Sequence, residues 1–301
     1  MKQRIRFVFG DAVVIGDLFR PAGKGPHPAV VVVGPMTSVK EQVAGVYAAA
    51  LAVRGIAALA IDHRHYGESG GMPRQYEHPG HKIADIRAAV DALIESPVVD
   101  AARVGLVGVC LGSSYAAAAS IGDSRVRALA TVAGYFPDPH QMDLGKGGDF
   151  DAEIESGTNA RKHFEQTGET LLVAAAAASG GAPMHLPDIV DYYGSTRAGV
   201  PNYRNEFAVM SREPWLSFDA QALAPLVTAP TLLVHAEGAL APRWAQQFHD
   251  SMRVERSIAY LEASSQVDFY DRPDRVDESA DLVARHLWHH FSDRRVVAES
   301  V

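Results

Sequence analysis

The sequence has little of several features that mark special classes of protein. One cysteine in 301 residues excludes an intramolecular disulfide and a zinc site built on cysteines. No run reaches the roughly 18 apolar residues that a membrane-spanning helix needs. The first residues also lack the apolar stretch of a secretory signal. We therefore expect a cytoplasmic protein that does not bind membranes.

Positive charge is scarce as well. The chain has 28 Lys and Arg against 36 Asp and Glu, for a net charge of −8. Such a surface repels a phosphate backbone on average, so we do not expect nucleic acid as a partner. The hydrophobic content of 47% is that of a globular protein and excludes disorder for the body of the chain.

Short β-branched runs alternate with alanine-rich stretches along most of the chain. This pattern predicts an α/β fold, with a mostly parallel sheet flanked by helices. A hairpin of strands 5–9 and 13–19 opens the chain, and the run 27–33 is apolar enough for a strand buried on both faces. The other expected strands are 56–62, 104–109, 126–133, 231–234 and 258–261. The expected core helices are 42–54, 83–96, 111–120 and about 276–291.

The alternation breaks down between residues 134 and 219. About 80 residues is too long for a plain loop, so we predict a helical cap inserted at 136–215 into a core of 1–135 and 216–301. Within the cap, helices are expected near 152–167 and 171–178. Its aromatic residues are expected mostly in the core of the cap, with some lining a pocket; they are Tyr192, Tyr193, Tyr203, Phe207, Trp215 and Phe218.

The string Gly108-Val109-Cys110-Leu111-Gly112 lies between a predicted strand and a predicted helix. It has the spacing of the G-x-nucleophile-x-G turn, in which small residues let the strand and helix approach while the nucleophile takes an unusual backbone conformation. A position at a helix N-terminus favours the thiolate form of Cys110. A buried, inert cysteine at the end of a strand is the alternative.

These residues resemble the α/β-hydrolase superfamily, in the branch of dienelactone hydrolases and fungal polyketide transferases. The resemblance covers nearly the whole chain. It includes the loop after the strand 27–33, the stretch 62–71 and the segment 267–271. It implies an α/β-hydrolase fold and a nucleophile at Cys110, but it is weak evidence for any particular substrate.

The resemblance also implies an oxyanion hole. One donor would be the backbone N–H of Leu111, directly after the nucleophile. The second would come from the loop that begins at Gly34. Pro35 has no N–H, so Met36 is the better candidate and Thr37 the next.

Two positions of the catalytic triad depart from the family. The segment that normally holds the acid has Glu237 as its only carboxylate. The position of the histidine base holds Gln266, which cannot take up a proton at any useful pH. Glu237 and Gln266 are therefore candidate site residues with unusual roles.

Three interpretations remain open from these departures. Another group supplies the proton transfer, the candidates on nearby loops being Glu237, His63, His65 and Glu41. Alternatively, the acyl-enzyme passes to an organic acceptor, as in an acyltransferase or a cyclase. In the third interpretation the chemistry is lost and the chain is a ligand-binding protein.

The first expectation is thus a hydrolase that attacks an ester, lactone or thioester through Cys110. The substrate would be a small molecule, apolar or containing a ring. No organic cofactor and no metal is expected, since His289 and His290 are more typical of cations at a helix C-terminus than of metal ligands. The sequence does not decide the oligomeric state, and a homodimer is kept as one expectation.

Overall fold

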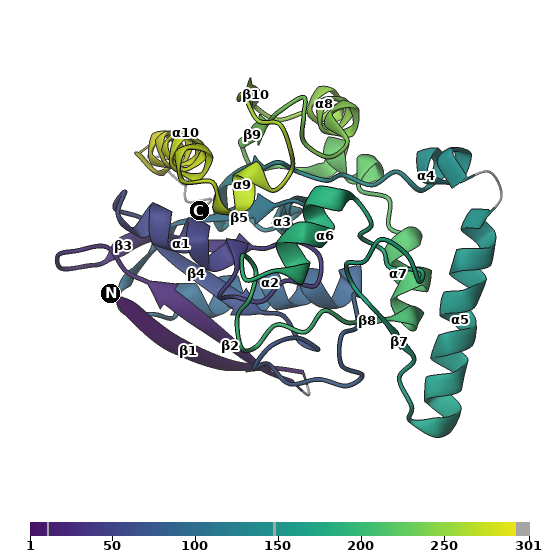
Figure 1. The fold of residues 1–301 in the computed structure, drawn as a ribbon. Helices are drawn as coiled ribbons and strands as arrows, with labels where there is room; N and C mark the ends of the chain where they lie inside the picture. The colour runs from purple at the N-terminus through teal and green to yellow at the C-terminus, as the bar shows by residue number, and fades with distance from the viewer. Residues whose placement is uncertain (11, 147–148, 293–301) are drawn as a thin grey trace, which may run out of the picture.

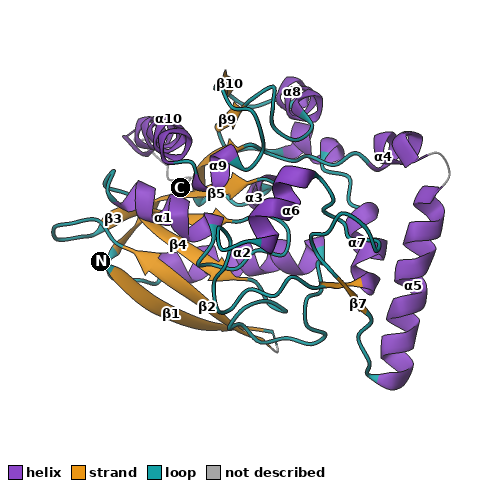
Figure 2. Ribbon diagram, viewed as in Figure 1, coloured by secondary structure: helices purple, strands orange, loops and turns teal. Residues whose placement is uncertain are grey.

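A central sheet of eight strands organises the molecule (Figures 1 and 2). The structure, a computed structural model, describes residues 1–10, 12–146 and 149–292. The strand order is β1-β2-β4-β3-β5-β6-β9-β10. The strands are β1 (Lys2–Phe9), β2 (Ala12–Phe19), β3 (His27–Val33), β4 (Ala57–Asp62), β5 (Val99–Val109), β6 (Val126–Val132), β9 (Thr231–His235) and β10 (Arg256–Tyr260).

The directions of the strands follow the pattern that the sequence predicts. β2 pairs antiparallel with β1 and with β4. The remaining neighbours in this sheet, in the order β4-β3-β5-β6-β9-β10, run parallel. Every residue of β3 is buried, as expected for a strand with helices on both faces. The predicted α/β fold with a mostly parallel sheet is confirmed.

Helices cover both faces of this sheet. α1 and α10 pack together on one face, and α2 and α3 pack together on the other (Figure 1). Apolar burial of these helices against the sheet forms one continuous core. The helices of this part are α1 (Val43–Ala52), α2 (Pro79–Ile94), α3 (Gly112–Ser120), α8 (Pro242–Ser251), α9 (Asp268–Asp271) and α10 (Pro273–Ser292).

The stretch between β6 and β9 adds one long helix and several short elements at one end of the sheet. The long helix α5 packs against α7 and the short turn η1, away from the sheet (Figure 1). The elements are α4 (Pro139–Lys146), α5 (Asp149–Thr167), β7 (Leu172–Val173), α6 (Pro187–Gly194), β8 (Phe207–Ala208), η1 (Val209–Ser211), α7 (Arg212–Leu216) and η2 (Gln221–Leu226).

The predicted helix near 171–178 is wrong. Leu172 and Val173 form β7 instead and pair with β8. The side chain of Asn205 accepts the backbone N–H of Ala176 and donates to its carbonyl, at 2.8 and 2.9 Å. These bonds satisfy backbone groups that a helix would otherwise pair internally.

None of the helices within the described ranges combines the length and the apolar character that crossing a bilayer requires.

Candidate active site

Cys110 lies in the sharp turn between β5 and α3, at the carboxyl end of the parallel strands. Its φ of 55° is uncommon for a residue with a side chain. Backbone hydrogen bonds hold the turn: the Cys110 N–H donates to Val132 O (3.1 Å), and the Ser113 N–H donates to Cys110 O (3.0 Å). The thiol therefore lies at the edge of the sheet where α/β proteins bind ligands.

The two glycines of the motif are required by close contacts. A Cβ on Gly108 would overlap the backbone of Ser113. A Cβ on Gly112 would overlap the carbonyl oxygens of Val33 and Gly34. The strand, the turn and the helix can approach this closely only without those side chains.

Gly112→Ala is expected to destabilise the protein by about 3 kcal/mol or more, because backbone oxygens cannot move away as a flexible side chain can. Gly194→Ala is the matched control, since no atom lies within 4 Å of its added Cβ. Urea unfolding followed by circular dichroism measures both variants. Equal stability of the two would contradict the close approach.

Four groups face the sulfur of Cys110. They are the backbone N–H groups of Leu111 and Met36, the Tyr270 hydroxyl and the Gln266 amide, and each lowers the pKa of the thiol. Burial opposes them and is the largest effect, so the pKa of Cys110 lies above its usual value. The N–H of Leu111 at the start of α3 thus favours the thiolate, but burial of the sulfur outweighs this donor and the other three.

The raised pKa predicts slow alkylation of Cys110 at neutral pH, with a rate that still climbs above the usual thiol pKa of about 8.5. Tyr270→Phe removes a donor to the sulfur and should slow alkylation at pH 8 by about threefold to tenfold, because one pKa unit changes the thiolate fraction tenfold. Tyr193→Phe is the control, since the Tyr193 hydroxyl is buried without a hydrogen-bond partner. Iodoacetamide labelling followed by mass spectrometry gives the rates. A rate that is flat from pH 7 to 9 would refute the prediction.

The loop after β3 supplies the second backbone donor. The backbone N–H of Met36 lowers the pKa of the Cys110 thiol, whereas the N–H of Thr37 donates to Glu77 Oε2 at 3.0 Å. Of the two candidates for the second oxyanion donor, Met36 is therefore the better one, because the N–H of Thr37 already donates to Glu77. Thr37 also has a positive φ of 57°, which is uncommon for a residue with a side chain.

Gln266, at the position where the resemblance implies a histidine, is held from both ends of its amide. Its Oε1 accepts the Leu240 N–H at 2.9 Å, and its Nε2 donates to Ala133 O at 2.9 Å and to the Tyr270 hydroxyl at 3.3 Å. Only 2% of the residue is exposed. Gln266 therefore orients Tyr270 beside the sulfur, but it offers no base.

The structure does not bring Glu237 to this site. Its side chain is exposed in the turn after β9, and it is not among the described residues that line the cavity at Cys110. The acid of a triad orients an imidazole, and Gln266 has the Leu240 N–H as partner instead. The geometry gives no support to Glu237 as a catalytic acid.

The other candidate bases lie outside the lining of the cavity at Cys110. His63 is buried with its Nδ1 3.6 Å from an Asp85 oxygen, and burial lowers its pKa. His65 contacts His81 at 2.9 Å between ring nitrogens. Glu41 accepts Lys40 Nζ at 2.7 Å. None of the three candidates lines the cavity at Cys110.

A cavity of about 190 Å³ opens at Cys110. Most of its lining is apolar, and its walls come from two parts of the chain. The part that belongs to the sheet and its loops contributes Met36, Cys110, Leu111, Tyr135, Leu240 and Tyr270. Residues further along, between 183 and 215, contribute Pro183, Met184, His185, Leu186, Ile189 and Trp215.

Two of these residues are functional candidates that the sequence did not single out. Tyr270 follows Gln266 by four residues, a spacing that places both on one side of a helical turn. His185 is the single imidazole among the described residues of the lining, and no local pattern marks it. Of the aromatic residues predicted for the cap, Trp215 reaches the cavity.

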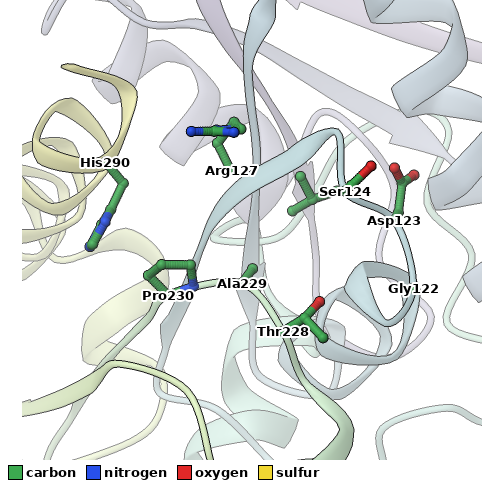
Figure 3. A pocket seen from close by; sticks show the side chains of 9 residues that line it. Gly122, Asp123, Ser124, Arg127, Thr228, Ala229, Pro230 and His290 are labelled. Carbon is green, nitrogen blue, oxygen red and sulfur yellow. The ribbon is translucent and has the colours of Figure 1, made fainter. Parts of the chain in front are cut away.

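Another cavity, of about 370 Å³, lies at the opposite end of the strands (Figure 3). It is bordered by the starts of β6 and β9 and by His290. A nearby group of Glu255, His289 and His290 brings possible metal ligand atoms within 4.8 Å of one another, but Glu255 and His289 are exposed. Active sites of open α/β sheets lie at the carboxyl ends of the strands, which favours the Cys110 cavity.

The strand order and the turn at Cys110 define the class: the chain has the α/β-hydrolase fold. A family model described as "Esterase FrsA-like" matches residues 1–139, which include Met36 and Cys110. Dienelactone hydrolase from Anabaena variabilis shares this fold, with a TM-score of 0.59 and 15% identity, covering 96% of this chain and 97% of that chain.

Two bacterial proteins match most of the chain. YcjY of Escherichia coli (strain K12), an uncharacterized protein, is 31% identical over 267 residues, which is 86% of this chain and 87% of YcjY. PA2218 of Pseudomonas aeruginosa is 31% identical over 290 residues, 90% of this chain and 76% of PA2218. The crystal structure of PA2218 superposes with a TM-score of 0.82 at 28% identity, covering 96% of this chain and 94% of that chain.

Fungal enzymes match over shorter stretches. Thiohydrolase aneE of Aspergillus aculeatus is 38% identical over 110 residues, 36% of this chain and 35% of aneE. Other fungal matches are named acyltransferase and polyketide transferase. The chain belongs to the family of YcjY and PA2218, has the α/β-hydrolase fold and is a hydrolase-type enzyme. Over shorter stretches it is similar to FrsA-like esterases, fungal thiohydrolases and polyketide transferases.

Proposed function

We propose that this enzyme cleaves a thioester or an activated ester through an acyl-Cys110 intermediate, and that it passes the acyl group to an acceptor or to water. One observation carries the proposal. The sulfur of Cys110 lies in a strained turn at an apolar cavity, with the N–H groups of Met36 and Leu111 directed at it.

In the first step the sulfur attacks the carbonyl carbon. The oxygen becomes negative in the tetrahedral intermediate, and the N–H groups of Met36 and Leu111 are placed to stabilise it. When the intermediate collapses, the bond to the leaving thiol breaks and acyl-Cys110 remains. The proton lost by Cys110 ends on the leaving thiolate, so this exchange is balanced without an external base.

The lack of a general acid at position 266 favours a thioester over an ordinary ester as the substrate. An alkoxide is a poor leaving group that needs a proton from a general acid, and a glutamine cannot donate one in that way. A thiolate leaves without such help because its conjugate acid has a pKa of about 8.5. The name thiohydrolase, given to aneE, agrees with this choice.

Resolution of acyl-Cys110 depends on the acceptor. Attack by water needs a base, and His185 is the one imidazole among the described residues that line the cavity. A thiol or amine acceptor is a better nucleophile and relies less on that base. We therefore propose acyl transfer as the faster route and hydrolysis as the slower one.

The size and lining of the cavity suggest the acyl group. Pockets for drug-sized ligands begin at about 300 Å³, whereas this cavity is about 190 Å³ and mostly apolar. We propose a short apolar acyl group. We also propose that 136–215 acts as a cap on a core of 1–135 and 216–301, since residues 183–189 and Trp215 wall the cavity. A cytoplasmic location and a homodimer stay predictions.

The test is the mass of the intact protein after incubation with butyryl-N-acetylcysteamine, a short acyl thioester. One added acyl group, located on Cys110 by peptide mapping, is the expected result. Release of butyrate is then compared with and without an added thiol acceptor. An unmodified Cys110 over thioester and activated-ester panels would overturn the proposal and favour a ligand-binding protein.

A further inference from the structure

A buried carboxylate outside the cavity accepts hydrogen bonds from the two segments that carry the proposed oxyanion-hole N–H groups. Glu77 lies just before α2 and is 0% exposed. Its Oε2 accepts the Thr37 N–H at 3.0 Å, Lys82 Nζ at 2.8 Å and the Tyr66 hydroxyl at 3.1 Å. Its Oε1 accepts the Tyr115 hydroxyl at 2.9 Å. Four donors thus converge on one carboxylate.

Two of these donors come from the segments that carry the oxyanion-hole N–H groups. Thr37 directly follows Met36 in the loop after β3, so the bond from its N–H to Glu77 holds the chain next to Met36. Tyr115 lies on α3, and its N–H donates to Leu111 O at 3.4 Å. One oxygen of Glu77 therefore fixes the Met36 side, and the other fixes the Leu111 side.

The charge of Glu77 is maintained in this buried place. Burial raises its pKa, but the ammonium of Lys82 and the other donors lower it overall, so the pKa lies below the usual value and the carboxylate is ionised. A carboxylate has two acceptor oxygens, whereas an amide has one. A glutamine at 77 can therefore accept from Thr37 or from Tyr115 but not from both.

We propose that Glu77 is a positioning residue of the oxyanion hole, which sets the distance between the N–H groups of Met36 and Leu111 by bonding Thr37 and Tyr115 at once. The inference rests on the proposed function. Glu77 is not among the described residues that line the cavity, so it acts through the two segments and not on the substrate.

The test compares two reactions of Cys110. Acylation by butyryl-N-acetylcysteamine passes through a negative oxygen and needs the hole, whereas alkylation by iodoacetamide displaces iodide and forms no such oxygen. Glu77→Gln combined with Lys82→Met removes both buried charges together, which avoids an unpaired charge. Outright loss of an oxyanion donor costs about 100- to 1,000-fold. Misplacing an oxyanion donor should cost less, so we expect the double variant to be acylated about 10- to 100-fold more slowly than the wild type. The rate of alkylation should change by no more than about threefold.

A matched pair of single variants covers the case in which the double variant fails to fold. Tyr115→Phe and Tyr66→Phe each remove one hydroxyl donor from Glu77, but Tyr115 alone of the two lies on α3. Tyr115→Phe should slow acylation at least about fivefold more than Tyr66→Phe. The apparent KM should stay close to that of the wild type, because the hole acts in the transition state.

The outcomes separate this inference from the proposed function. If the wild-type protein is not acylated, the proposed function fails and this inference fails with it. If the wild type is acylated and the variants match its rate, only the role of Glu77 is wrong. If acylation and alkylation fall by the same factor, Glu77 is merely structural and the inference is overturned.

Discussion

Cys110→Ala is expected to abolish the acyl adduct and to lower thioester turnover at least about 1,000-fold, as loss of a nucleophile does. Alanine keeps the turn and both oxyanion donors but has no atom that can form the new bond. Intact mass and release of the free thiol measure the two effects. The stability of the variant, measured by thermal unfolding, should stay near that of the wild type, since only one small buried side-chain atom is removed.

Cys110→Ser tests whether the thiol itself is needed. A hydroxyl attacks only when a base takes its proton, and Gln266 cannot act as that base. The serine variant should therefore be nearly as inactive as the alanine variant. A serine variant with substantial activity would reveal a base near residue 110 and contradict the mechanism. Turnover that survives in Cys110→Ala would exclude covalent catalysis by this residue.

Gln266→His is expected to raise the hydrolysis of acyl-Cys110 by about 100-fold, the lower end of what a general base contributes. Gln266 already lies beside the sulfur and Tyr270, so an imidazole there can take a proton from an attacking water. Single-turnover release of butyrate from the acylated protein gives the rate.

Gln266→Met is the matched control for this gain. It keeps a long side chain at position 266 but has no basic atom, so it should not speed hydrolysis. Its loss of the bonds to the Leu240 N–H and Ala133 O should cost about 1 to 3 kcal/mol of stability. If Gln266→His leaves hydrolysis unchanged while acylation proceeds, a different group already serves water, and His185 is the residue to replace next.

The core of the fold could be predicted from the sequence because its patterns are local. The apolar, valine-rich run before Gly34 predicts a strand buried on both faces, and this run forms β3. The segment 171–178 could not be predicted in this way. Its backbone is satisfied by Asn205, about 30 residues further along the chain, and an apolar, alanine-rich run alone favours a helix.

In the site, too, local patterns in the sequence can be predicted, whereas contacts between distant residues cannot. Cys110 and its two glycines are marked by a steric motif within five residues. Glu237 is a candidate only by its place in the sequence, which does not say where a loop side chain points. The pKa of Cys110 depends on how much water the surrounding elements exclude, and sequence position at a helix start does not report that. His185 and Glu77 take their roles only from three-dimensional packing.

The walls of the cavity at Cys110 come from two different stretches of the chain. The reactive centre and its electrostatic support are encoded by the sheet and its loops, whereas residues 183–189 and Trp215, which lie in a different stretch, face them across the cavity. Mutations in that stretch can reshape the space for the acyl chain without disturbing the thiol. Paralogues can therefore differ in chain-length preference while retaining one chemistry.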